Sequence, residues 1–164
     1  MLIDDIRALL ELYGEKIEQD IRTKMAEDGT VATGASNSSL SNTVDNTKLQ
    51  VSGNISIAVV SEGRPAGKDF PNINNIQRWI NAKGIRPNKP NVRPRDLAYI
   101  IGRAISQNGS LALPKFGYKG SGLLDFVIRQ NEEPLTADLA DLGLQYLDTE
   151  LMAEARKNPD FKIQ

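Results

Sequence analysis

The first 25 residues carry apolar side chains every three or four positions, which constrains the start of the chain to an amphipathic helix with one buried face. This helix is expected to run to about residue 27, where Gly29 is well placed to follow its carboxyl end. Gly14 lies inside the pattern and weakens the helix locally by roughly 1 kcal/mol relative to Ala. The stripe consists of Ile3, Ile6, Leu10, Tyr13, Ile17, Ile21 and Met25.

Alternating apolar residues further along the chain predict a half-buried strand with a bulge at Gly53. A weaker strand from about Leu40 to Val44 precedes it, with a turn at 45–47, so the pair forms an antiparallel hairpin. The polar stretch 30–47 buries little and is expected to begin as a mobile loop. The alternating positions are Leu49, Val51, Ile55, Ile57 and Val59.

Helical spacing returns after the hairpin. A short helix is expected over 72–82, with Trp79 in the core, and a second helix begins at Pro94, after a proline-rich, basic connector over 85–95. The apolar run 123–128 is compatible with either helix or strand and should end at Pro134.

A last helix is predicted over 136–157, starting at Thr136 or Asp138 and stopped by Asn158-Pro159. The expected fold is therefore α+β: a small antiparallel hairpin packed with an N-terminal helix, two central helices and a long C-terminal helix. One domain should cover 1–158, followed by a frayed tail over 159–164. A chain of 164 residues suits one core.

The chain contains no Cys and no His, which excludes thiolate nucleophiles, disulfides, Cys/His zinc sites and imidazole-based triads. The loop 62–68 lacks the glycine spacing and the hydroxyl of a phosphate loop, and 117–122 lacks the strand–helix context of a dinucleotide site. Neighbouring acids such as Asp4/Asp5 and Glu132/Glu133 are typical solvated pairs. We therefore expect no enzyme activity, no cofactor, no metal and no catalytic residues. An acidic N-terminus and the lack of a long apolar run argue against a signal peptide and a membrane partner.

Charge is strongly segregated along the chain. Residues 1–62 hold 5 basic and 10 acidic groups, residues 63–120 hold 11 and 2, and residues 121–164 hold 4 and 9. The basic segment is compatible with a solvated face, with a surface that follows a nucleic-acid backbone, or with a patch that meets the acidic surface of a neighbouring copy. The candidates for an interface or a DNA passage are Arg64, Lys68, Lys83, Arg86, Lys89, Arg93, Arg95, Lys115 and Lys119.

Residues 31–128 resemble the virion proteins of tailed bacteriophages known as connector, neck, tail-completion or minor tail proteins. The resemblance rests on Ala32-Thr33-Gly34, on Glu62-Gly63-Arg64-Pro65-Ala66-Gly67, on Trp79-Ile80-Asn81-Ala82-Lys83-Gly84-Ile85 and on 97–105, followed by a glycine-rich loop and Phe126-Val127-Ile128. Ala66, which separates Pro65 from Gly67, departs from the family's loop.

This resemblance implies an α+β subunit that forms a homo-oligomeric ring at the head–tail junction or in the tail, without catalysis. Its partners would be copies of itself, the adjacent connector, portal or tail proteins, and either a neighbour's acidic surface or the passing genomic DNA at the basic segment. Its place would be the virion, assembled in the bacterial cytoplasm. The alternative is a nucleic-acid-binding module that uses the basic segment 63–120.

Overall fold

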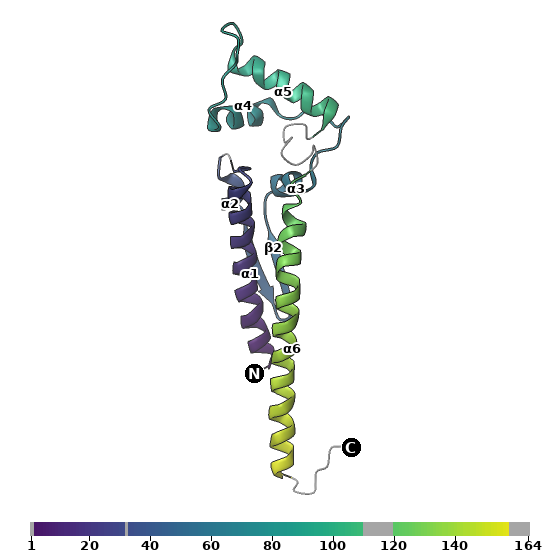
Figure 1. The fold of residues 1–164 in the computed structure, drawn as a ribbon. Helices are drawn as coiled ribbons and strands as arrows, with labels where there is room; N and C mark the ends of the chain where they lie inside the picture. The colour runs from purple at the N-terminus through teal and green to yellow at the C-terminus, as the bar shows by residue number, and fades with distance from the viewer. Residues whose placement is uncertain (1, 32, 110–119, 158–164) are drawn as a thin grey trace.

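The computed structural model describes residues 2–31, 33–109 and 120–157, and it is dominated by two long helices that run antiparallel side by side (Figure 1). These are α1 (Leu2–Glu27) and α6 (Leu123–Lys157). Two side-chain hydrogen bonds fix their register: Asn131 Nδ2 donates to Asp20 Oδ2 at 2.8 Å, and the Tyr13 hydroxyl donates to Asp138 Oδ2 at 2.7 Å. The N-terminal stripe therefore forms the expected helix, and α6 is its main packing partner.

The expected hairpin is present and lies against α1. Strands β1 (Ser41–Asp45) and β2 (Lys48–Ser52) pair antiparallel with Ser41 opposite Ser52, and Asn46 adopts a positive φ of 50° in the turn. A Cβ placed on Gly14 would lie 2.8 Å from Asn42 Oδ1 and 2.9 Å from Leu49 Cδ1. Gly14 thus lets the hairpin approach the helix backbone. This close approach explains why a glycine, which weakens the isolated helix, occupies this position.

The prediction that the second strand continues through residue 59 is wrong. The chain leaves the sheet at Ser52 and forms α3 (Ile55–Glu62), where the Asn54 side chain accepts a hydrogen bond from the Ser56 backbone N–H at 3.0 Å. Burial follows a helical period, because Ile57 is 4% exposed and Ile55 is 76% exposed. The short helix α2 (Ala35–Ser38) likewise occupies a segment expected to be a mobile loop.

Ser61 connects α3 to the start of α6. Its buried hydroxyl accepts the Leu124 backbone N–H at 2.9 Å, and its carbonyl accepts that of Gly122 at the same distance. This contact satisfies amide groups at the beginning of a helix, which have no partner within the helix itself. The segment 123–128, for which the sequence allowed helix or strand, is helical.

Pro134 lies inside α6, so the predictions of a break there and of a separate helix beginning at Thr136 or Asp138 are wrong. An internal proline costs a helix about 3 kcal/mol through its missing N–H and its ring. Packing against α1 continues on both sides of this position, through Asn131 before it and Asp138 after it, which holds the two halves in one helix. The expected stop at Asn158-Pro159 and the tail 159–164 lie outside the described residues.

The two central helices form where they were expected. Helix α4 (Ile73–Ala82) is capped by Asn72, and α5 (Pro94–Asn108) begins at Pro94. We refer to residues 73–108, which comprise these helices and their connector, as the α4–α5 unit. The connector has no regular secondary structure up to Arg93, as predicted.

The described side chains pack into two hydrophobic clusters. The first lies between α1, α3 and α6 and contains Ile21, Met25, Leu40, Ile57, Leu123 and Val127. The second belongs to the α4–α5 unit, where Ile76, Ile80 and Ala98 are buried and Trp79 is half-buried against them. The fold is α+β with a long C-terminal helix, as expected, whereas a single domain over 1–158 stays a prediction. Among the described helices, none has the length and hydropathy to cross a membrane.

Gly14→Ala should destabilise the protein although Ala is the better helix former. The added methyl group overpacks the contact with the hairpin at a cost of about 1–3 kcal/mol, which exceeds the roughly 1 kcal/mol gained in helix propensity. Gly143→Ala is the matched control, because a Cβ there meets no atom within 4 Å and should raise stability. Urea unfolding followed by circular dichroism measures both variants. A gain of stability in Gly14→Ala would contradict the observed packing.

The Tyr13–Asp138 contact should be lost in alkaline solution. The hydrogen bond to Asp138, followed by burial and the charge of that carboxylate, raises the pKa of Tyr13 above its ordinary value of 10.0. The stabilisation from this contact is therefore complete below pH 10.0 and disappears as the pH rises through the higher pKa of the folded protein. Thermal unfolding across this pH range should show that the wild type loses more stability than Tyr13→Phe does. Equal losses of stability in the two proteins would argue against the contact.

Candidate interaction surface

The basic candidates from the sequence fall into groups with different roles. Lys83 donates its ammonium hydrogen bonds to the carbonyl oxygens of Gly29 at 2.9 Å and Val31 at 2.7 Å. These carbonyls follow the carboxyl end of α1, where a cation is electrostatically favoured. Lys83 thus joins α4 to α1, and its first role is structural.

Two further candidates also make internal contacts. The Arg93 guanidinium bonds both carboxylate oxygens of Asp96, with Nε–Oδ2 at 2.9 Å, and this hydrogen bond holds the pKa of Asp96 below its usual range. The same pair closes the first turn of α5. Arg64 donates to the Asp69 carbonyl oxygen. Arg93 and Arg64 therefore stabilise local backbone.

Lys68, Arg86, Lys89 and Arg95 are exposed. Arg103, which the sequence reasoning did not select, is exposed on α5 as well. None of these five makes an ion pair with a carboxylate in the described ranges 2–31, 33–109 and 120–157. They leave positive charge available to a partner. Lys115 and Lys119 lie outside the described residues.

An aromatic pair lies next to two of these charges, because Arg95 and Arg103 are one helical turn before and after Tyr99. The rings of Phe70 and Tyr99 stack with their centroids 5.3 Å apart, and a Cβ on Gly102 would come within 2.8 Å of the Phe70 ring. Tyr99 and the neighbouring Ile100 are more than half exposed. The contact between Phe70 and Tyr99 could not be predicted from the sequence, because a loop residue and a helix residue 29 positions apart share no periodicity.

The other charged region is the far part of α6, which projects past the N-terminal end of α1 (Figure 1). Leu144, Leu147 and Leu151 are exposed there by 64%, 56% and 42%. They recur at intervals of three and four residues and so share one side of the helix. The exposed carboxylates of Asp141, Asp148, Glu150 and Glu154 flank this side.

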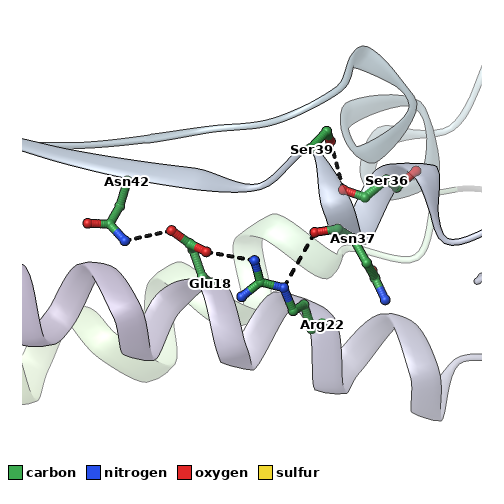
Figure 2. A network of polar contacts seen from close by, with 6 residues as sticks. All are labelled: Glu18, Arg22, Ser36, Asn37, Ser39 and Asn42. Carbon is green, nitrogen blue, oxygen red and sulfur yellow. Dashed lines mark hydrogen bonds and ion pairs between the residues drawn. The ribbon is translucent and has the colours of Figure 1, made fainter.

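One buried carboxylate has the burial expected of a catalytic group. Glu18, only 8% exposed, accepts a hydrogen bond from Asn42 Nδ2 at 2.5 Å and one from Arg22 Nη2 at 2.7 Å, and Arg22 Nε donates to the Asn37 carbonyl at 3.4 Å (Figure 2). Both carboxylate oxygens are occupied by donors from within the fold. The network therefore links α1 to β1 and α2 and leaves no oxygen to act on a substrate.

A cleft of about 700 Å³ separates the α4–α5 unit from α1–α3. Arg78, Trp79 and Lys83 line one wall. The facing wall carries Ser36 and Ser56, whose hydroxyls bond each other at 2.7 Å. No carboxylate among the described residues lines the cleft, so none of them serves as a general base for either serine there. Nor do three or more potential metal-ligating side chains gather anywhere in the part of the chain that the structure describes.

Comparison with protein-family models, with curated proteins and with solved structures found no match for this chain.

Glu18→Ala should destabilise the protein by about 1–3 kcal/mol, because it removes the buried carboxylate that the half-buried donors of Asn42 and Arg22 share. Glu18→Gln keeps the shape of the side chain and one carbonyl oxygen as acceptor, so this variant should lose less stability than Glu18→Ala. Glu15→Ala is the control: Glu15 is exposed on the same helix and should change stability by no more than about 0.5 kcal/mol. Urea midpoints measure all three. Equal losses for Glu15→Ala and Glu18→Ala would contradict the network.

Proposed function

We propose that this protein is a structural subunit of a tailed bacteriophage particle and assembles as a ring at the head–tail junction or in the tail. Support comes first from the resemblance of residues 31–128 to connector, neck and tail-completion proteins. Three motifs of that stretch occupy the loop before α4, the end of α4 and most of α5, and Phe126-Val127-Ile128 lies in α6. In this proposal the protein has a structural role in the particle, and its partners are other copies of this chain and the adjacent virion proteins.

The observation that carries the proposal is the exposed leucine face of α6. Large apolar side chains are also exposed on three other helices: Ile3 and Leu12 on α1, Ile55 and Val59 on α3, and Tyr99 and Ile100 on α5. Contiguous exposed apolar residues on a protein surface mark interaction sites. Contact with neighbouring subunits would cover the apolar side chains of all four helices.

The distribution of charge supports the same proposal. The α4–α5 unit and its flanking loop, residues 63–109, hold nine basic and two acidic side chains, whereas α6 holds eight acidic and three basic ones. Surfaces of opposite sign on one molecule favour association between copies and fix their orientation. They also explain how a protein with a net charge of −1 can present strongly charged surfaces.

A nucleic-acid-binding module is the second candidate. The observation that favours it is the position of Arg95 and Arg103 one helical turn before and after Tyr99, exposed and without an ion pair among the described residues. Basic and aromatic side chains together bind a nucleic-acid backbone and bases. The eight acidic residues of α6 repel such a ligand, which makes this candidate the weaker one.

Immunogold electron microscopy of purified particles tests the proposed function. Gold should decorate one site on each particle, at the neck or along the tail, and the protein should be present in several copies per particle by quantitative mass spectrometry. A major capsid protein serves as the labelling control. If purified particles lack the protein, the proposal is wrong.

A DNA-binding measurement separates the two candidates. A dedicated binder should hold duplex DNA at about 150 mM salt and lose affinity steeply as salt increases. Arg86→Glu with Lys89→Glu removes two exposed charges of the connector, and Lys48→Glu in the hairpin turn is the control. Tight binding that only the connector variant abolishes would favour the nucleic-acid module over the structural subunit.

A further inference from the structure

The exposed leucines of α6 lie on a side of the helix that no described element covers. At 100° per residue, Leu144, Leu147 and Leu151 point away from the side that carries the half-buried Leu142 and Tyr146. We call these three leucines with their flanking carboxylates Asp141, Asp148, Glu150 and Glu154 the α6 stripe. It is an apolar strip with acidic edges.

The charges at its edges restrict what can cover the stripe. Two α6 stripes packed together would bring like charges into contact, which is unfavourable. Nucleic acid and anionic lipid are disfavoured for the same reason. The partner that fits is an apolar strip with basic edges.

A surface that combines apolar and basic side chains is present on α5 of the same chain. Tyr99 and Ile100 are exposed there, Phe70 stacks on Tyr99, and Arg95 and Arg103 lie one helical turn before and after Tyr99. We call these five residues the α5 face. Both arginines are exposed and make no ion pair among the described residues.

The spacing of the charges also matches. Asp141 and Asp148 are seven residues apart on α6, and Arg95 and Arg103 are eight apart on α5. At 1.5 Å per residue these intervals are about 10 Å and 12 Å. Each aspartate can therefore approach one arginine while the leucines lie against Tyr99 and Ile100.

We propose that the α6 stripe of one copy docks on the α5 face of a second copy of this chain. The α4–α5 unit and the projecting part of α6 lie at opposite ends of the molecule (Figure 1), so the two surfaces of one copy cannot meet each other. Each copy docks its α6 stripe on one neighbour and accepts the α6 stripe of another neighbour on its α5 face. Such a heterologous contact produces a ring if its rotation closes and a filament if it does not.

This inference rests on the proposed function, because it names the contact between copies that ring assembly needs. One helix packed on another buries less than the 1,200–2,000 Å² or so of a stable protein–protein interface. We therefore expect weak pairwise association that closure of a ring reinforces. Screening by about 1 M salt should weaken it further.

Charge reversal on each surface tests the contact in the full-length protein. Sedimentation velocity would compare the wild type with an α6 variant (Asp141→Lys, Asp148→Lys) and an α5 variant (Arg95→Glu, Arg103→Glu). Each variant alone should bind itself at least tenfold more weakly than the wild type. The control exchanges the paired charges of the hairpin turn, Asp45→Lys with Lys48→Glu, and should associate like the wild type.

Mixing the two variants gives the decisive result. The α5 variant keeps an intact α6 stripe and the α6 variant keeps an intact α5 face, so these two surfaces can dock in a mixture, and the reversed charges on the other two surfaces are opposite in sign as well. The mixture should therefore recover association into complexes that contain both variants, which also demonstrates that both variants are folded. A chain carrying all four reversals has its charges exchanged and should recover association.

The outcomes separate this contact from the proposed function. If the wild type associates and neither variant weakens this association, or if the mixture forms no complexes that contain both variants, the docking proposal is overturned while a virion role stands. A wild type that stays monomeric at every concentration overturns the docking proposal too. If the protein associates through these charges but is absent from purified particles, the virion role alone is overturned.

Discussion

The antiparallel packing of α1 and α6 is the interaction on which the rest of the body depends. This packing buries Ile21 and Met25 of α1, and it keeps α6 continuous across Pro134. The hairpin lies against α1 at Gly14, and α3 contacts the start of α6 through Ser61. The hairpin and α3 are therefore positioned by the two long helices.

The same packing creates the unpartnered surface. Helix α1 ends before α6 does, so the far turns of α6 continue with leucines that no described element covers (Figure 1). At the other end of the molecule, the α4–α5 unit packs around its own small cluster and presents its basic side chains outward. An elongated molecule with apolar, oppositely charged surfaces at its two ends is suited to association with further copies, which is how the proposed ring would form.

The buried polar groups serve the fold. Glu18 occupies the kind of position in which a catalytic carboxylate could be tuned, yet Arg22 and Asn42 take both of its oxygens. Asn131, almost fully buried, ties α6 to Asp20. Lys83, a sequence candidate for an interface, instead satisfies carbonyls after α1. A residue type alone could not reveal these roles, because each depends on a partner from another element.

The sequence by itself determined the elements whose signal is local. The spacing of apolar residues located α1, α4 and α5, the turn at Asn46 located the hairpin, and the charge counts located the basic segment. Only the tertiary structure decided the rest. Alternating residues at 55–59 became a helix because capping by Asn54 and burial of Ile57 outweighed a period-two pattern, and Pro134 remained inside α6 because α1 packs on both sides of it. The charges that remain available for a partner were likewise fixed by folding, since internal contacts engage Lys83 and Arg93 and leave Arg95 and Arg103 exposed and without ion pairs among the described residues.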